Sequence, residues 1–318
     1  MKLKEITIEV AQQCPNRCVY CSSLSDMEKG AALDFDVICA VIDDALLLGA
    51  TNISLSGGEP FLREDIVKIV DYINTKGIKP RLYSCGIYCE NGRYSAVPTT
   101  LLEEVKDKLE SLIFNYETVN AELYASIMGT EPANMTLLDT TINGAVMQSI
   151  PVEAHMVPMH CNYKQIPEVL EKLYAMGVTK VSFLRLVSQG RAINNRDMVE
   201  LNRSEQQELA HIFDNCKALY KDKVRLGLPF SANRTNCGTG TVKLIVRYDG
   251  FVFPCEAFKD GQMEFLQGVI VDNVKNMRLK DIYEHSAYLQ AVRDGFRVYS
   301  EGDRYEQCYG QFCRQASN

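Results

Sequence analysis

The stretch Cys14-Pro15-Asn16-Arg17-Cys18-Val19-Tyr20-Cys21 decides how the rest of the chain is interpreted. It follows residues 6–10, whose alternating β-branched side chains predict a strand, so the three thiols belong to the loop after that strand. Three thiolates in one loop can ligate three irons of a four-iron cube and leave the fourth iron open to a non-protein ligand. Spacing alone keeps two alternatives open: a zinc site without a fourth nearby Cys or His, and a disulfide with a spare thiol.

Composition indicates an ordinary globular protein. Its 318 residues, 46% apolar and 24% charged, suffice for a sizeable core and two domains. The 12 cysteines favour metal or redox chemistry, because the sequence starts without the apolar segment of a secretory signal. No run of about 18 apolar residues occurs, so we expect a cytoplasmic protein with no membrane partner. The net charge of −7 disfavours nucleic acid as a partner.

Strand and helix patterns alternate after the cysteine loop. Helices are predicted over residues 33–48, 63–76, 99–109, 134–148 and 165–176, and strands over 52–55, 79–83, 111–115, 152–157 and 180–187. This alternation implies a parallel sheet with right-handed crossovers, whose sites lie at the carboxyl ends of the strands. Gly57-Gly58-Glu59-Pro60, Ser84 and Asn115 fall at such ends, so we expect them to meet the cysteine loop at one mouth.

Two motifs, in this order, resemble those of a known family. Cys14-x3-Cys18-x2-Cys21, with the aromatic Tyr20 before the last cysteine, is similar to the signature of radical S-adenosylmethionine (SAM) enzymes. Gly57-Gly58-Glu59-Pro60 resembles the family's second motif, which lines the methionine end of SAM. The resemblance implies an α/β fold with a partial (β/α)6 TIM-like barrel over residues 1–200. It also implies that a 4Fe-4S cluster on the three cysteines binds SAM and cleaves it reductively, so that a 5'-deoxyadenosyl radical abstracts hydrogen from carbon.

Other expected SAM contacts match the family less closely. Asn115 stands at the end of the fourth strand, where relatives have serine or a similar polar residue; a strand-terminal turn residue is the alternative interpretation. Met128 replaces the arginine that related enzymes place before the equivalent of Gly129, so Arg185 is our expected cation for the SAM carboxylate. The full set of expected SAM-binding residues is Tyr20, Gly57, Gly58, Glu59, Pro60, Ser84, Asn115 and Arg185.

Residues 201–318 depart from the α/β alternation and form the second expected domain. A helix is predicted over residues 204–220. Residues 242–248 and 251–253 then flank Asp249-Gly250, a pair that favours a tight β-hairpin.

Four cysteines surround this hairpin and the C-terminal tail. With Cys237 before it and Cys255 at its end, the hairpin resembles the opening of the SPASM or shorter Twitch extension of radical SAM enzymes. Cys308 and Cys313 would complete a four-cysteine set, which implies one auxiliary 4Fe-4S cluster in a small iron-sulfur domain. A structural zinc site on the same four thiols is the alternative.

The resemblance leaves two substrate classes for an oxidoreductase-type enzyme. The first is a peptide, in the maturation of a ribosomal precursor by crosslinking or epimerisation, although the first strand starts too close to Met1 to leave room for an N-terminal peptide-recognition domain. The second is a small molecule, such as a sugar or aminocyclitol, that is dehydrogenated or epimerised. An electron donor such as flavodoxin or ferredoxin is implied in both cases.

Overall fold

The computed structural model describes residues 2–227, 237–259, 264–301, 308–310 and 313. Its strands are β1 (Glu5–Ala11), β2 (Asn52–Gly57), β3 (Arg81–Ser84), β4 (Ile87–Glu90), β5 (Arg93–Ala96), β6 (Ser111–Asn115), β7 (Val152–Met156), β8 (Lys180–Phe183), β9 (Val224–Leu226), β10 (Lys243–Val246) and β11 (Val252–Phe253). Nine of them form one sheet in the order β11-β10-β1-β2-β3-β6-β7-β8-β9. Every pair in this sheet is parallel except β10–β11.

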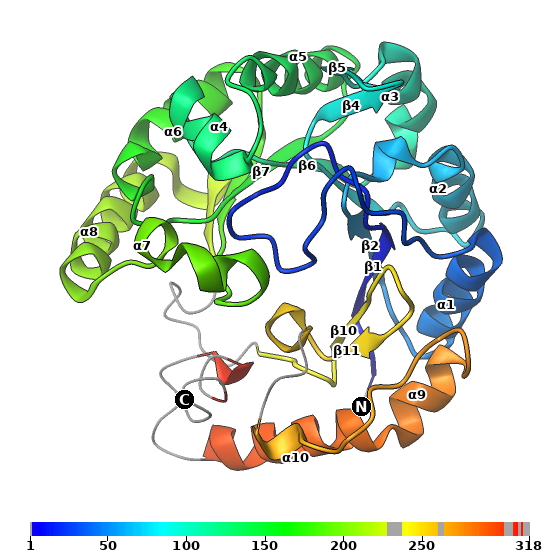
Figure 1. The fold of residues 1–318 in the computed structure, drawn as a ribbon. Helices are drawn as coiled ribbons and strands as arrows, with labels where there is room; N and C mark the ends of the chain where they lie inside the picture. The colour runs from blue at the N-terminus through cyan, green and yellow to red at the C-terminus, as the bar shows by residue number, and fades with distance from the viewer. Residues whose placement is uncertain (1, 228–236, 260–263, 302–307, 311–312, 314–318) are drawn as a thin grey trace.

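Helices cover the outer face of the curved sheet (Figure 1). They are α1 (Phe35–Leu47), α2 (Ile66–Thr75), α3 (Thr99–Val105), α4 (Ala121–Met128), α5 (Asn134–Met147), α6 (Ile166–Ala175), α7 (Arg196–Val199), α8 (Arg203–Tyr220), α9 (Leu279–His285) and α10 (Ala287–Glu301). Short 3-10 turns join several of them, including η4 (Gly190–Asn195). In the part of the chain that the structure describes, no helix has the length and apolar character needed to cross a membrane.

The alternation of side chains along β1 explains how this sheet can enclose a polar space. Ile6, Ile8 and Val10 are fully buried in the hydrophobic core, where each contributes roughly 1.5–3 kcal/mol. Thr7 and Glu9 alternate with them and line a cavity inside the barrel. One face of the strand therefore stabilises the fold, while the other supplies polar groups to the site.

The six expected barrel strands are confirmed as β1, β2, β3, β6, β7 and β8. The last is shorter than predicted, because it ends at Phe183, and Arg185 lies two residues beyond it. The β4–β5 hairpin was not predicted, although Asn91-Gly92 is a strong signal for a two-residue turn and both residues have positive φ, 51° and 75°.

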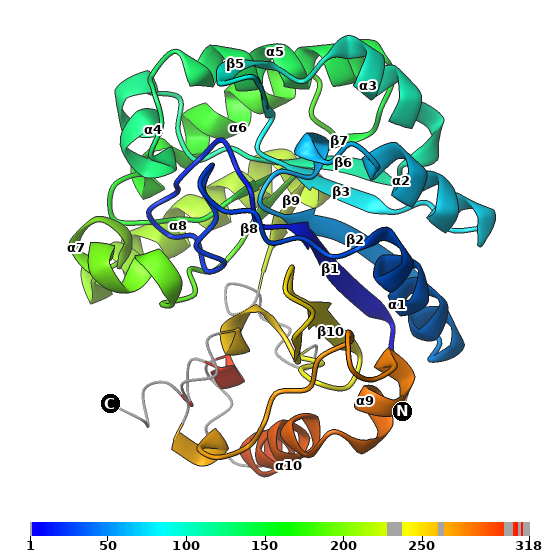
Figure 2. The ribbon, with the colours of Figure 1, turned by 45° about the vertical axis from the view of Figure 1, so that its right-hand side comes forward.

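The predicted C-terminal hairpin is confirmed as β10–β11, but its place in the sheet was not foreseen. Glu5 of β1 pairs with Lys243 of β10 in a parallel register, so the hairpin extends the barrel sheet beside its first strand (Figure 2). Helix α9 packs on α1 through an ion pair in which Arg278 Nη2 lies 2.6 Å from the buried Asp44 Oδ1. The expected domain boundary at residue 200 stays a prediction, and the sheet continues across it.

Candidate functional site

The cysteine loop crosses the mouth of the barrel and is held by the end of α4 (Figure 1). Arg17 N donates to Met128 O at 2.8 Å, and Val19 N donates to Ile127 O at 2.9 Å. Gly129, in the left-handed region at φ 60°, lets the two backbones approach: a Cβ there would lie 2.5 Å from Arg17 O. The segment that carries the departure Met128 thus docks the cysteine loop through its backbone.

Arg191 of η4 holds the same loop from the other side. Its Nε donates to Cys18 O at 2.8 Å, and its Nη2 donates to Ser25 O at 2.6 Å. Its backbone N donates to Cys21 O at 3.1 Å. Charge-assisted bonds of this kind are stronger than neutral ones, so a residue far along the chain fixes the carbonyls next to two of the cysteines.

The three thiols are free and lie close together. Burial raises the pKa of the Cys18 thiol well above its ordinary value, and Cys14 and Cys21 raise it further. Three neighbouring thiolates without a counter-charge would repel one another, so a cationic iron-sulfur core fits this loop. Among the described residues, no three His, Cys, Asp or Glu side chains converge closely enough to hold a single metal ion.

The Gly57-Gly58 turn abuts the backbone that leads into the loop. Gly58 N donates to Ala11 O at 2.7 Å, and Cβ atoms at Gly57 and Gly58 would lie 2.2 Å from Ala11 O and 2.0 Å from Gln13 O. Side chains are therefore excluded at both positions. Both glycines line the cavity below the cysteines, as expected for a turn that a ligand must approach closely.

Glu59, the next residue, is turned away from the cavity and fully buried. Its carboxylate accepts bonds from Ser84 Oγ at 3.0 Å and from Cys85 N at 2.6 Å. Burial raises the pKa of this carboxyl. Glu59 thus ties the Gly-Gly turn to the end of β3 instead of facing a ligand.

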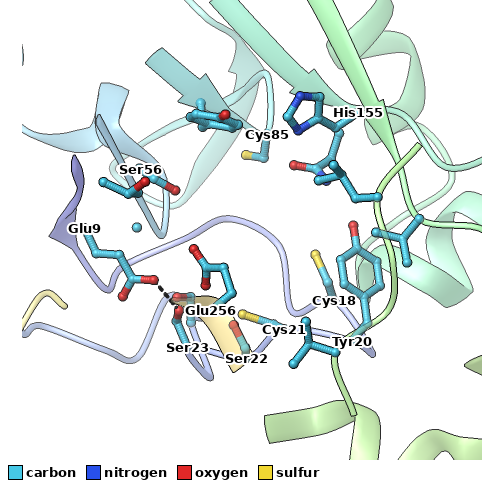
Figure 3. A pocket seen from close by; sticks show the side chains of 18 of the residues that line it. Glu9, Cys18, Tyr20, Cys21, Ser22, Ser23, Ser56, Cys85, His155 and Glu256 are labelled. Atoms are coloured by element: carbon cyan, nitrogen blue, oxygen red, sulfur yellow. Dashed lines mark hydrogen bonds between the residues drawn. The ribbon is translucent and has the colours of Figure 1, made fainter. Parts of the chain in front are cut away.

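One cavity of about 400 Å³ joins the cysteine loop to the inside of the barrel. Figure 3 shows Cys18 and Cys21 facing the same space as Glu256, with His155 on another wall. Among the predicted SAM-binding residues, those that line the cavity are Tyr20, Gly57, Gly58, Ser84, Asn115 and Arg185. The other two, Glu59 and Pro60, are buried and do not line it.

Glu117, a fully buried carboxyl two residues after β6, was not predicted as a site residue. It accepts bonds from Tyr20 OH at 2.7 Å, from Val157 N at 2.8 Å and from Asn115 Nδ2 at 3.5 Å. Burial raises its pKa to about 7. Glu117 therefore fixes two predicted SAM contacts, Tyr20 and Asn115; its position just past a strand end was the one available signal.

The position before Gly129, where related enzymes have an arginine, carries no cation in this chain. Met128 occupies that position, and its Sδ lies 3.9 Å from Cys18 Sγ. Arg185 lines the cavity, and the thiols near it are those of Cys308 and Cys255. Burial lowers the pKa of the Arg185 guanidinium, and the two thiols offset part of that lowering. The structure therefore places Arg185 toward the C-terminal cysteines, and its expected role toward the SAM carboxylate stays a prediction.

Three of the four C-terminal cysteines come close to one another. Burial raises the pKa of Cys255 to about 12, with further increases from Cys308 and Cys237. Thr239 Oγ1 lies 3.4 Å from Cys255 Sγ. Cys313 is buried and neighbours Tyr309. These thiols are also free. Three of the four cysteines expected to ligate the auxiliary cluster are thus neighbours, and the full ligand set stays a prediction.

Lys259 connects the two cysteine groups and was also missed. Its ammonium forms ion pairs with Glu9 of β1 and with Glu256 Oε2 at 2.5 Å. It also donates to Ser23 Oγ at 3.0 Å and Ser22 Oγ at 3.2 Å, directly after Cys21. Its side chain is only 4% exposed. One buried cation thus joins the cysteine loop to the segment that follows Cys255.

Family models match most of the chain. A model described as "Radical SAM superfamily" matches residues 8–187, and a SPASM model, described as "Iron-sulfur cluster-binding domain", matches residues 237–314. Both agree with the expected cofactors, 4Fe-4S clusters and SAM.

The chain is also similar in sequence to curated relatives and in fold to solved structures. The PqqA peptide cyclase of Methylobacterium nodulans is 25% identical over 292 residues, covering 90% of this chain and 74% of the relative. That of Gluconobacter oxydans is 24% identical over 296 residues, covering 90% and 77%. The structure of Streptococcus suis SuiB bound to S-adenosylmethionine superposes with a TM-score of 0.75 at 15% identity, covering 99% of this chain and 75% of SuiB. That of anSMEcpe with bound AdoMet gives 0.67 at 14% identity, covering 97% and 88%.

Proposed function

Because this chain belongs to the radical SAM superfamily, we propose that it is a peptide-modifying enzyme that abstracts hydrogen from a ribosomal peptide to form a crosslink or an epimer. The peptide assignment is supported by relatives named as PqqA peptide cyclases over 90% of this chain. When bound, a 4Fe-4S cluster and SAM supply the radical that removes a hydrogen atom from carbon.

One observation carries the proposal: the cavity that the first three cysteines line is also lined by the residue that directly follows Cys255. Cys14, Cys18 and Cys21 line it on one side, and Glu256, directly after Cys255, lines it on the other. A substrate in this cavity would lie between the two expected clusters. This arrangement supports an auxiliary cluster that accepts an electron from the substrate.

The chain's own residues would bind and orient the cluster and SAM, and would exclude water from the cavity. Cys14, Cys18 and Cys21 would hold the first cluster. The bare backbone of Gly57 and Gly58 gives SAM a surface without side chains, and Tyr20 and Asn115 are held rigidly by Glu117. Positioning of this kind is the main contribution of a protein to chemistry that belongs to the cofactor.

The C-terminal residues have a separate assignment in this proposal. Cys237, Cys255, Cys308 and Cys313 would hold one auxiliary cluster with no open iron. Reducing electrons would come from a small donor such as flavodoxin or ferredoxin.

The proposal is tested by anaerobic reconstitution with iron and sulfide, followed by iron counting and a reductant-driven SAM cleavage assay. We expect about eight irons in the wild type and about four in the Cys14→Ala, Cys18→Ala, Cys21→Ala triple variant, with cleavage lost only in the variant. Intact SAM in the wild type, or zinc retained on the C-terminal cysteines, would contradict it.

The substrate class needs its own measurement. A short peptide encoded beside the gene is incubated with the reconstituted enzyme, SAM and reductant, and its mass and fragmentation are recorded. Loss of hydrogen atoms, or incorporation of solvent deuterium at one α-carbon, is the expected result. A peptide that returns unchanged while a sugar or aminocyclitol is oxidised would favour the small-molecule alternative.

A further inference from the structure

Asn16, between the first two cysteines of the loop, has a side chain that is buried and makes no hydrogen bond. It is only 1% exposed, and it lines the same cavity as Cys14 and Cys18. Neither its Nδ2 nor its Oδ1 has a hydrogen-bond partner among the residues that the structure describes. A buried amide without partners destabilises a folded protein, so this side chain needs another group to complete its bonds.

A second unpartnered group lies near Asn16. Tyr124 of α4 is fully buried, and its hydroxyl makes no hydrogen bond within the described part of the chain. Burial raises the pKa of this phenol, the nearby Cys85, Cys18 and Cys14 raise it further, and the interaction with Asn16 lowers it. The hydroxyl is therefore a neighbour of both the amide and these thiols, and it reaches hydrogen-bond geometry with none of them.

Backbone contacts hold the two residues next to each other. Arg17 N donates to Met128 O, so the segment directly after Asn16 is docked on the end of α4, the helix that carries Tyr124. The close approach at Gly129 leaves no room there for a side chain. These contacts use neither the amide of Asn16 nor the hydroxyl of Tyr124, which leaves both groups for another partner.

The hydrogen-bonding capacities of the two groups are complementary. A phenol hydroxyl can donate to the amide oxygen of asparagine, which leaves the two N–H groups of Nδ2 as donors without an acceptor. Cys14 and Cys18 stand two residues before and two residues after Asn16, and all three line the cavity. The two thiols would become thiolates when they ligate iron, and a negatively charged sulfur is a better acceptor than a neutral thiol. Asn16 would thus gain its missing acceptor when the cluster is bound.

We propose that the Asn16 amide donates a hydrogen bond to a sulfur of the first cluster, that Tyr124 orients this amide, and that the bond raises the reduction potential of the cluster. This inference rests on the assignment of the first cluster to Cys14, Cys18 and Cys21 in the proposed function, and it adds a donor and its positioning residue. Hydrogen bonds to the sulfurs are among the factors that set the potential of an iron-sulfur cluster. The reduced cluster carries one more negative charge than the oxidised cluster, so a donor stabilises the reduced form more.

The test measures the reduction potential of the first cluster in the anaerobically reconstituted full chain, without SAM, by redox titration followed by EPR spectroscopy. The signal of this cluster is the one that the Cys14→Ala, Cys18→Ala, Cys21→Ala variant lacks. Asn16→Leu removes both N–H donors and fills the buried site with an apolar side chain. At a fixed potential we expect its ratio of reduced to oxidised cluster to fall about tenfold, which for one electron is a shift of about −59 mV.

Two further variants separate the hydrogen bond from packing. Tyr124→Phe removes only the hydroxyl that would orient the amide, and it should lower the same ratio by about threefold. Asn134→Leu is the matched control, because Asn134 is a buried asparagine of α5 that does not line the cavity. Its replacement should leave the potential of the first cluster unchanged.

A spectroscopic measurement on the wild type does not depend on the folding of any variant. Enzyme that carries nitrogen-15 only in its asparagine side chains is reconstituted and reduced, and the coupling of this nitrogen to the electron spin of the cluster is recorded by pulsed EPR. We expect a nitrogen-15 coupling in the wild type and in Asn134→Leu, and its loss in Asn16→Leu. A wild type without this coupling would overturn the inference.

An Asn16→Leu variant with the potential of the wild type would also overturn it, and weaker SAM binding by that variant would then assign the amide to SAM. If Asn16→Leu does not retain the cluster, the wild-type coupling and the potential of Tyr124→Phe decide. The proposed function fails separately. A wild type that shows the coupling but leaves SAM and peptide unchanged would reject the enzyme assignment, whereas an active wild type without the coupling would reject the hydrogen bond alone.

Discussion

The two cysteine groups are assembled from the chain in different ways. The first is local: Cys14, Cys18 and Cys21 fall within eight residues of one loop. The second is gathered from distant parts of the chain, since Cys237 precedes a hairpin, Cys255 ends it, and Cys308 and Cys313 lie in the tail. The cysteines of a local motif are close together by their spacing in the sequence, whereas those of a dispersed group depend on the folded sheet to bring them together. The first group should therefore tolerate loss of the second.

Removing a ligand of the second group gives the largest effect that tests this independence. Cys255→Ala should lose about four of about eight irons, because the auxiliary cluster loses a ligand, while SAM cleavage without peptide continues. Iron counting and the cleavage assay measure both. Cys39→Ala, on α1 outside the cavity, is the control and should keep all iron. Loss of cleavage in Cys255→Ala would show that the two groups are not independent.

Breaking the connection between the groups should have the next largest effect. Lys259→Met leaves the Glu9 carboxylate buried beside the cysteine loop without its cation, which should cost about 3–5 kcal/mol of unfolding free energy. Urea unfolding of the reconstituted enzyme measures it. The exposed Lys280→Met is the control, expected within about 0.5 kcal/mol of the wild type.

A double variant separates charge from packing. Glu9→Gln combined with Lys259→Met should recover part of the loss, because no unpaired charge remains buried. If Lys259→Met alone unfolds like the wild type, the ion pairs of Lys259 do not couple the two groups.

A smaller, pH-dependent effect on stability is expected from Glu117, which holds Tyr20 of the first cysteine group. Burial raises the pKa of Glu117 from 4.5 to about 7, so the folded protein binds a proton at this carboxyl more tightly than the unfolded chain does. That contribution to stability is complete below pH 4.5 and is lost as the pH rises through about 7. Glu117→Gln cannot lose it, so between pH 5 and 7.5 the variant should gain about 1–3 kcal/mol relative to the wild type.

Urea unfolding at the two pH values measures this gain. Glu122→Gln, exposed on α4, is the control and should follow the wild type at both. Parallel wild-type and Glu117→Gln profiles would show that the Glu117 carboxyl is not protonated in the folded state.

The sequence predicted what is decided locally. The cysteine loop, the Gly57-Gly58 turn and six barrel strands follow from short-range spacing and periodicity, and all lie where expected. The orientation of Glu59 could not be predicted in this way. Its carboxylate turns to Ser84 and Cys85, which are partners from another strand end.

Contacts between segments that are far apart along the chain could not be predicted from the sequence. A lone glutamate or lysine in a sequence is most often a solvated surface residue, so nothing marked Glu117 or Lys259 as buried. Their roles depend on which strand ends meet, and Lys259 also depends on β10 pairing with β1. The set of charged side chains that line the cavity could likewise not be predicted, because they come from several strands that meet only in the folded sheet.

The pairing of the first strand with a late one sets an order of events during synthesis. Cys14, Cys18 and Cys21 leave the ribosome first, yet β1 acquires its neighbour β10 only after Lys243 has emerged. Arg191, which holds the carbonyl of Cys18, and Lys259, which holds Ser23, also arrive late. Until then β1 is an open sheet edge and the thiols have no finished pocket. The contacts that surround the earliest cysteines are therefore complete only when nearly the whole polypeptide has been synthesised.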